Sequence, residues 1–274
     1  MQDPAKLIQQ YSNKDLAQKR IWYSPTAEAY NRTRPHYPKS LVDRVIELTQ
    51  LANGATILEI GCGPATATVT FAELGFSMLC LEPNLDFCAI ARRNCAQYSK
   101  VKIQNTSFEE WELEVERFNA VLAATSIHWI PQEVAYPKAA NALQKDGVLI
   151  LLWNVPAIPS WETYQELQDL YQVYAPSLSE YKGKEAHEAE LREIEKIVIN
   201  SGRFKDVVSE KNVSEVTYSA DEYLMLLSTF SPYLELDTIS RNALFEGLQH
   251  KINENFAGRL QLFNLSAFHV ARKN

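Results

Sequence analysis

The stretch from Ile57 to Ala65 constrains the fold more than any other part of the chain. An apolar run that contains one acidic residue, Glu59, passes directly into Gly61 and Gly63, and an Ala/Thr-rich segment follows. Because glycine has no Cβ atom, the backbone can turn sharply there and bring its N–H groups against a ligand. This pattern predicts a strand, a ligand-cradling turn and a helix that covers the sheet.

The residues around the turn narrow the class of ligand. A dinucleotide-binding fingerprint has Gly or Ala at the sixth position of G-x-G-x-x-G, where this chain has Thr66. A carboxylate at Glu59 would repel a pyrophosphate but suits a cofactor with an ammonium group. S-adenosylmethionine has that group and no phosphate.

The same run resembles motif I of the class I S-adenosylmethionine-dependent methyltransferases, written E/D-x-G-x-G-x-G, with Ala65 in place of the third glycine. The resemblance implies that Glu59, Gly61, Cys62 and Gly63 bind the cofactor. Two alternatives stay open. One is an NAD(P)-dependent oxidoreductase of Rossmann type, and the other is a catalytically silent protein that binds S-adenosylmethionine.

Composition and charge exclude several classes of protein. The 274 residues are 46% hydrophobic and 22% charged, as in an ordinary globular chain, and the net charge of -7 argues against nucleic acid or an anionic membrane as a partner. No apolar run reaches the length of a membrane span, and the N-terminus lacks the apolar region of a signal peptide. We expect a cytoplasmic monomer or homodimer.

The cysteines indicate neither a metal site nor a disulfide framework, since their spacing fits neither. We expect them to be small buried side chains. A redox role for Cys62, which lies inside the glycine turn, is the alternative.

Alternating strand and helix patterns predict an α/β fold. Together with the resemblance they indicate a Rossmann-like, doubly wound, seven-stranded sheet, mostly parallel with an antiparallel last strand, and a helical cap. The expected strands are Ala55–Ile60, Ser77–Glu82, Lys100–Gln104, Phe118–Ala124, Val148–Trp153, Phe204–Tyr218 and Arg259–Ala271. Helices are expected at about 39–51, 65–74, 161–174, 183–201, 220–230 and 236–256, after Asn84 and from Pro131, with a turn at 145–147.

The chain divides into three consecutive parts in this interpretation. Residues 1–38 form an N-terminal lid segment, of which the first 20 or so are expected to be loosely held. Residues 39–154 form the S-adenosylmethionine-binding core. Residues 155–274 form the helical substrate-cap insertions and closing strands six and seven of the same domain.

Glu82 ends the second strand about twenty residues after the glycines, an arrangement in which a carboxylate accepts both hydroxyls of a ribose. By resemblance, Pro83 and Phe87 flank the adenine. A core position in the next helix, which Asn84 caps, is the alternative for Phe87.

Two further strand ends contribute cofactor-binding candidates by resemblance. Ser107 and Phe108 match positions that contact the adenine edge in related methyltransferases, many of which have Asp where this chain has Ser107. Ala124 and Ser126, at the end of the fourth strand, lie where ligands bind in such folds.

An aromatic segment before the first helix resembles the Tyr-x-x-x-Arg-Pro-x-Tyr-Pro lid of the trans-aconitate methyltransferase-like subgroup. Tyr30, Arg34, Pro35, Tyr37 and Pro38 match it. The resemblance places Tyr30 and Arg34 at the cofactor and Tyr37 at the substrate, and a strap packed on the first helix is the alternative. An arginine beside tyrosines suits a carboxylate, of the substrate or of the cofactor's methionine portion, and related lids favour the cofactor.

The substrate end is expected at the same rim of the sheet. His128 and Trp129 resemble the subgroup's motif after strand four, Trp153 and Asn154 end strand five, and Tyr233 lies in a segment that resembles the subgroup's cap. The implied reaction is methylation of a small molecule, with a carboxylate or hydroxyl oxygen as the nucleophile. A hydroxyl would need a base, for which His128 is the candidate, although a structural role is its alternative.

Overall fold

The sheet orders the whole molecule. The computed structural model of the chain describes residues 11–274, and its strands follow the order β3-β2-β1-β4-β5-β8-β6, with β7 paired along β8. The strands are β1 Thr56–Ile60, β2 Ser77–Leu81, β3 Val101–Gln104, β4 Phe118–Ala124, β5 Leu143–Asn154, β6 Ile158–Pro159, β7 Phe204–Ser219 and β8 Arg259–Lys273. All seven expected strands occur, so the predicted fold is confirmed, and the two-residue β6 is an addition to it.

Strand direction agrees with the prediction. The neighbours from β3 to β5 pair in parallel, whereas β8 runs antiparallel to β5, β6 and β7. The parallel strands read as nearly continuous apolar runs because helices cover both of their faces.

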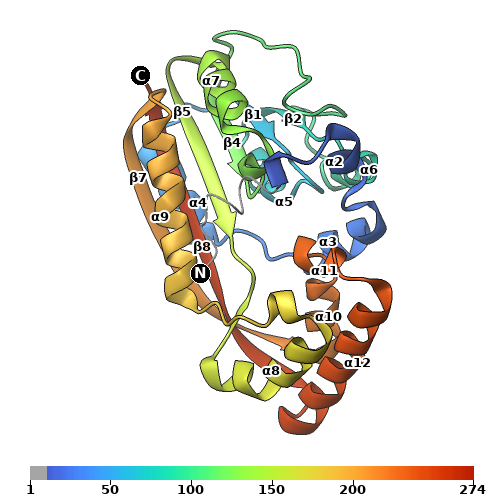
Figure 1. Cartoon of the computed structure of the whole chain (residues 1–274). Coiled ribbons are helices and arrows are strands. Elements are labelled where there is room, and N and C mark those ends of the chain that lie inside the picture. Colours follow the sequence, from blue (N-terminus) through green and yellow to red (C-terminus); the bar gives the residue numbers. More distant parts are fainter. Residues whose placement is uncertain (1–10) are drawn as a thin grey trace.

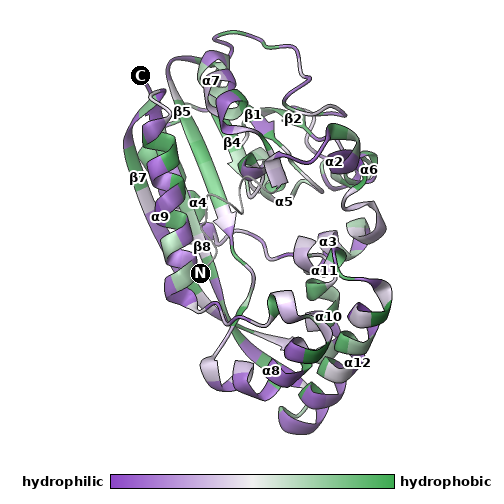
Figure 2. Cartoon of the chain, in the orientation of Figure 1, coloured by the Kyte–Doolittle hydropathy of each residue, from purple (hydrophilic) through white to green (hydrophobic). Residues whose placement is uncertain are grey.

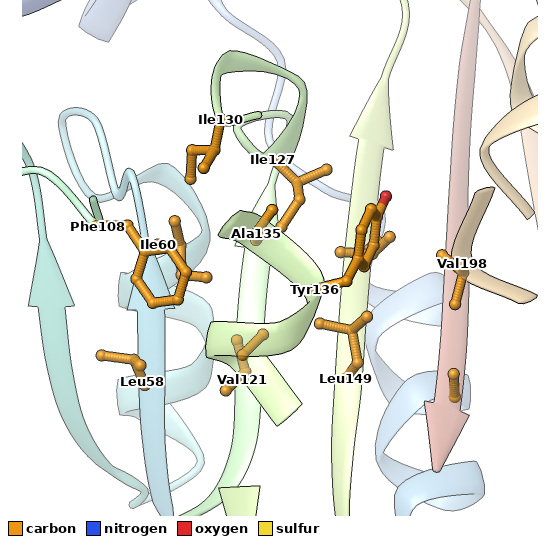
Figure 3. Close-up of a cluster of buried hydrophobic side chains, with 14 of the residues drawn as sticks. Leu58, Ile60, Phe108, Val121, Ile127, Ile130, Ala135, Tyr136, Leu149 and Val198 are labelled. Atoms are coloured by element: carbon orange, nitrogen blue, oxygen red, sulfur yellow. The ribbon is translucent and has the colours of Figure 1, made fainter. Parts of the chain in front are cut away.

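Helices cover the sheet in two layers (Figure 1). On one face α4 (Lys39–Thr49) contacts β8 and α5 (Thr66–Glu73) contacts β2, over the core that contains Ile57 of β1. On the other face α7 (Gln132–Ala142) contacts β4 and β5, and α9 (Lys184–Asn200) contacts β7 and β8, over the core that contains Leu58. Figure 3 shows Ala135 and Tyr136 of α7 and Val198 of α9 in this core. Alternate residues of β1 therefore enter different cores. The helix α6 (Leu85–Asn94) follows β2 and contacts β3.

The predicted turn at 145–147 is wrong. Pairing between β4 and β5 passes from Phe118 opposite Leu143 to Ala120 opposite Val148, so residues 144–147 of β5 lie opposite the single residue Asn119 of β4. They form an irregularity inside that strand, which starts at Leu143 directly after α7. A Lys-Asp-Gly sequence indicates a break in regular pairing and does not distinguish a turn from a bulge.

A third apolar core lies beyond the end of the parallel strands. There β7 and β8 continue past β5 and support α8 (Trp161–Tyr174), α10 (Ala220–Leu227) and α12 (Thr238–Asn255), with the short α11 (Ser231–Leu234) between them (Figure 1). The spacing of Trp161, Tyr164, Leu167, Tyr171 and Tyr174 on α8 predicts one core-facing side of the helix. Tyr164, Leu167 and Tyr171 are buried in the core, whereas Tyr174 is partly buried and Trp161 is 48% exposed. In Figure 2 these helices are apolar toward one another and hydrophilic outside.

The N-terminal segment lies over the sheet rim as α2 (Leu16–Ile21), a 3-10 turn (Ser24–Thr26) and α3 (Ala27–Thr33). The expectation that residues up to about 20 are loosely held is not met from Tyr11 onward. The Tyr11 ring lies 4.9 Å from that of Trp129, and Lys14 pairs with Glu235 at 3.1 Å. Residues 1–10 of the predicted lid lie outside the described residues.

The remaining 3-10 turns are Ile127–Trp129 and Pro176–Leu178. Between residues 11 and 274, no helix is long and apolar enough to cross a membrane.

Candidate active site

A cavity opens where β1, β2, β4 and β5 end, beneath α3 and α10. It encloses about 1240 Å³ of space, part of it open to solvent. Its wall includes most of the residues expected at the site: Tyr30, Arg34, Tyr37, Gly61, Cys62, Gly63, Glu82, Pro83, Phe87, Ser107, Phe108, Ala124, Ser126, Trp129 and Asn154. Residues from both halves of the chain therefore surround one space.

The glycine turn after β1 needs left-handed backbone at three positions. Gly61 has φ 64°, Gly63 has φ 55°, and Ala65, which replaces the third glycine, has φ 73°. A Cβ on Gly61 would lie 2.8 Å from the Cβ of Ser126, whereas a Cβ on Gly63 would meet nothing within 4 Å. Gly61 therefore permits close approach of the segment after β4, and Gly63 leaves open space beside the cavity.

Glu82 presents a carboxylate that the backbone already orients. Its Oε2 accepts the N–H of Gly63 and its Oε1 accepts the N–H of Asn84, each at 2.8 Å. Burial raises the pKa of Glu82 to about 7, and the two hydrogen bonds oppose this rise. Each oxygen keeps a lone pair for one hydroxyl of a diol.

Glu59 is not among the residues that line the cavity, and its contact with the cofactor stays a prediction. Its side chain points toward α5, where Oε2 accepts the hydroxyl of Thr68 at 2.6 Å and the thiol of Cys80 lies 3.6 Å away. Burial raises the pKa of Glu59 to about 7. Its Oε1 has no partner among residues 11–274. Glu59 thus joins β1 to α5.

Cys62 lines the cavity as a free thiol. The neighbouring Cys80 and burial raise the pKa of Cys62 well above the usual range. Because the thiolate is the reactive form, this environment favours the interpretation of Cys62 as a small buried side chain.

The end of the cavity near β2 and β3 is aromatic. Phe87 forms part of the wall there. The centres of the Tyr23 and Tyr30 rings lie 5.6 and 5.0 Å from the centre of the Phe87 ring. Phe87 is also 4% exposed and donates its N–H to Asn84, so it is both a core and a wall residue. Ser107 donates its hydroxyl to Glu110 at 2.8 Å, which directs the hydroxyl toward that carboxylate.

The opposite end joins the lid to two strand ends. The phenol of Tyr37 is hydrogen-bonded to Thr125 at 2.9 Å, and Asn154 donates its amide N–H to the carbonyl of Pro35 at 2.8 Å. The Asn154 Oδ1 accepts the hydroxyl of Ser266 at 2.6 Å. Thr125 is a β-branched residue at φ 54°, an uncommon conformation that is often found at functional sites.

Arg34 connects the N-terminal segment, the predicted lid, to Thr229 in the predicted cap by two hydrogen bonds. Its Nε donates to the hydroxyl of Thr229 at 2.9 Å and its Nη2 donates to the Thr229 carbonyl at 2.6 Å. The guanidinium carbon lies 4.5 Å from the Tyr30 ring and 3.9 Å from the Phe230 ring. No carboxylate of residues 11–274 pairs with this cation. The segment is thus a cover above the cavity.

Three residues expected at the substrate, His128, Trp153 and Tyr233, are not among the residues that line the cavity, and their contact with the substrate stays a prediction. The ring of His128 packs 5.8 Å from that of Trp153, its Nδ1 has no partner among the described residues, and burial lowers its pKa to about 4. Trp153 donates its indole N–H to His269 at 3.2 Å. The phenols of Tyr233 and Tyr171 bond to each other at 2.9 Å within the cap core.

The comparisons with known proteins agree with this geometry. Residues 57–147 match the family model described as a methyltransferase domain. Over 212 residues the chain is 26% identical to a probable S-adenosylmethionine-dependent methyltransferase of Saccharomyces cerevisiae, with 71% of each chain covered. This chain is a class I S-adenosylmethionine-dependent methyltransferase.

An uncharacterized methyltransferase of Mycobacterium tuberculosis is 30% identical to this enzyme over 143 residues. The match covers 52% of the enzyme and 55% of the relative, so the enzyme spans about half the length of that protein. None of these relatives carries a subgroup name, and membership of the trans-aconitate methyltransferase-like subgroup stays a prediction.

Solved structures show the fold of the methyltransferase again. A putative type II methyltransferase from Anaeromyxobacter dehalogenans is 16% identical, covers 87% of this chain and 97% of its own, and gives a TM-score of 0.62. A phosphoethanolamine N-methyltransferase of Haemonchus contortus, solved with S-adenosylhomocysteine, is 15% identical, covers 96% of this chain and 60% of its own, and gives 0.54.

The cofactor of this methyltransferase is S-adenosylmethionine, and the cavity has groups that fit it. The two oxygens of Glu82 can accept the ribose hydroxyls, Phe87 and Tyr30 offer apolar rings for the adenine, and the turn at Gly63 leaves room for backbone contact. Because Glu82 is fixed by two backbone N–H groups, it is oriented before the cofactor binds.

Several residues that line the cavity of the methyltransferase were not predicted from the sequence. Tyr23 is one of them, and its phenol bonds to Ser231 at 2.9 Å. Trp22, which is not among the lining residues, donates to the same hydroxyl at 3.1 Å, so the aromatic segment is bound to the cap. Their aromatic character was the available signal. Thr125 also lines the cavity, and its signal was its place between Ala124 and Ser126 at the end of β4. Asn264 lines the cavity without a local sequence signal.

Proposed function

We propose that this methyltransferase transfers the methyl group to a carboxylate oxygen of a small molecule. Four charged residues line the cavity, Lys19, Arg34, Glu82 and Glu109, and their formal charges cancel. S-adenosylmethionine brings a sulfonium, an ammonium and a carboxylate, so the loaded cavity would have one net positive charge. An acceptor with one negative charge neutralises it.

The observation that carries the proposal is the lack of a free base in the described wall. Lys19 and Glu109 pair at 3.1 Å, and Glu82 is held by backbone N–H groups. Burial raises the pKa of Tyr23 and of Tyr37. A hydroxyl acceptor would need a group to take its proton, whereas a carboxylate is already ionised. These surroundings favour a carboxylate over a hydroxyl.

The reaction then needs no proton transfer. A lone pair of the carboxylate oxygen forms the new C–O bond, the C–S bond breaks, and its electron pair goes to sulfur. The products are a neutral methyl ester and S-adenosylhomocysteine. The opposite charges of nucleophile and sulfonium disappear together, which a cavity of low dielectric constant favours.

The chain's part is to align the reactants and exclude water. In this proposal, residues 39–154 hold the cofactor together with Tyr30 and Arg34 of the lid, and residues 155–274 and the rest of the lid enclose the acceptor. Bonds from Arg34 and Tyr23 to the cap keep the cover in place. We also propose a cytoplasmic monomer or homodimer that does not act on nucleic acid, in keeping with the net charge of -7.

A chemical property of methyl esters tests the proposal. The enzyme is incubated with a metabolite extract and methyl-labelled S-adenosylmethionine, and the products are treated with alkali. Methyl esters release labelled, volatile methanol, whereas methyl ethers and methylamines keep their label. We expect the volatile label, and we expect none from the Glu82→Ala variant. A product whose label survives alkali would overturn the choice of a carboxylate.

A further inference from the structure

Asn264 places an unused hydrogen-bond acceptor in the cavity wall. It lies on β8, on the same face of the strand as Leu262 and Ser266, and its side chain lines the cavity. Its Oδ1 is buried and has no hydrogen-bond partner among residues 11–274. Buried polar atoms without a partner are uncommon in proteins and cost stability, so this oxygen needs an explanation.

The amide nitrogen of Asn264 faces the neighbouring phenol of Tyr218, and the amide oxygen does not. Burial raises the pKa of Tyr218, and a hydrogen bond with the Asn264 side chain opposes the rise. Because Oδ1 has no partner, this bond comes from the amide nitrogen. The nitrogen is thereby used on Tyr218, and the oxygen is left for another group.

Asn154 gives the contrast within the same wall. Its amide nitrogen donates to the Pro35 carbonyl and its oxygen accepts from Ser266, so both ends are used inside the protein. Pro35 offers only an acceptor there, which fixes the orientation of Asn154. Of these two wall amides, Asn264 alone keeps its oxygen free of the described residues.

The other wall residues contributed by α10 and by the chain after β5 are apolar. They are Leu226, Val155 and Ala157. These side chains have no polar atom to satisfy Asn264. A ligand that enters this part of the cavity is therefore the group able to donate to its oxygen.

We infer that Asn264 accepts a hydrogen bond from the methyl acceptor. The inference rests on the proposed function and narrows it, since the acceptor then carries a hydroxyl or N–H group in addition to the carboxylate that is methylated. A site that hydrogen-bonds such a group discriminates against the analogue that lacks it, because the buried oxygen is then left unpaired. Asn264 is in this account a specificity-determining residue.

Matched pairs of carboxylic acids test the inference. The probes are phenylacetate with para-hydroxyphenylacetate, and hexanoate with omega-hydroxyhexanoate, each assayed for alkali-labile methyl transfer. We expect the hydroxylated member of at least one pair to show a kcat/KM about tenfold higher or more. We expect this ratio to fall to about one in Asn264→Leu.

Two further variants separate the hydrogen bond from packing. Asn264→Asp keeps an acceptor oxygen and should keep the preference. Gln261→Leu, at an exposed position of the same strand outside the cavity wall, should leave both the ratio and the affinity for S-adenosylmethionine unchanged. Thermal unfolding shows that each variant is folded.

The outcomes are distinguishable. Equal rates within both pairs, or a preference that persists in Asn264→Leu, would overturn the inference and leave the proposed function standing. A preference lost in Asn264→Asp would mean that the ligand accepts from the amide nitrogen, which also overturns it. Methylation of no probe acid, with label from an extract that survives alkali, would remove the proposed function itself.

Discussion

Glu82 and Gly63 are joined by a hydrogen bond of 2.8 Å from the backbone N–H of the glycine turn to the carboxylate after β2. Two segments that a cofactor must contact at once are thus held together by the protein itself. A second bond, from the N–H of Asn84, fixes the other carboxylate oxygen. Orientation of this kind reduces the entropy lost on binding.

The Glu82→Ala variant should bind S-adenosylmethionine about a hundredfold more weakly or worse. The change leaves two ribose hydroxyls unpaired, and hydrogen bonds to charged groups contribute about 1.5–3 kcal/mol each. Titration calorimetry measures the effect, with Glu47→Ala at an exposed position of α4 as the control. A dissociation constant equal to that of the wild type would remove Glu82 from the cofactor site.

The Ala65→Gly variant should be more stable than the wild type by about 1 kcal/mol. Ala65 holds φ 73°, where a Cβ atom is unfavourable and glycine is not. Denaturant unfolding measures the difference. Ala89→Gly, at an exposed position within the right-handed α6, is the matched control and should lose about 1 kcal/mol. Equal losses in both variants would mean that the turn stores no strain at Ala65.

The glycine turn after β1 could be predicted from the sequence. The spacing of its glycines, the apolar run before them and the distance along the chain to Glu82 are all local signals. The sequence did not predict the direction of Glu59. In a strand buried on both faces, apolar residues occupy both sets of alternate positions, so the pattern does not tell which face an acidic residue shares. Glu59 shares the face of Ile57 and meets α5.

Contacts between segments that are distant along the chain could not be predicted from the sequence either. The bonds from Trp22 and Tyr23 to Ser231 depend on how the cap folds back over the sheet, and no spacing within the chain records that. Asn264 lies on an alternating strand where a polar residue looks like an outward position. Asn264 lies on the part of β8 that extends past β5 and pairs with Ser214 of β7, and the three-dimensional structure reveals that it faces the cavity.

Glu59 should make the enzyme less stable as the pH rises. Burial raises its folded pKa to about 7 from the ordinary 4.5, so the folded state holds the proton more tightly than the unfolded state. The stability is fully present below about pH 4.5 and is lost as the pH rises to about 7, by on the order of 3 kcal/mol. Glu82 acts in the same direction.

Unfolding of the wild type and of Glu59→Gln, followed in denaturant from about pH 5 to pH 8, measures this contribution. The variant keeps a neutral side chain of the same size, so its stability should fall less steeply with pH. Glu47→Gln, whose side chain is 71% exposed, should match the wild-type slope. Parallel curves for Glu59→Gln and the wild type would show that Glu59 titrates near its ordinary pKa.

The Arg34→Lys variant separates two uses of the lid cation. Lysine keeps the charge but loses the planar fork that can bind a carboxylate in two parallel bonds, and it loses the stacking on Tyr30 and Phe230. Two of the guanidinium nitrogens, Nε and Nη2, already donate to Thr229. The third nitrogen, Nη1, makes no hydrogen bond within residues 11–274. We expect the affinity for S-adenosylmethionine to fall by about tenfold, because one charge-assisted bond is lost.

If Arg34 instead holds the acceptor, the affinity for S-adenosylmethionine stays at the wild-type value while the KM of the acceptor rises or the turnover falls. Calorimetry with the cofactor and steady-state kinetics with the acceptor therefore distinguish the two cases. Arg44→Lys, on the exposed side of α4 where Arg44 pairs with Glu47 and Glu210, is the control and should change neither quantity. Wild-type values of both quantities in Arg34→Lys would leave the guanidinium with one role, that of bonding the lid to Thr229 of the cap.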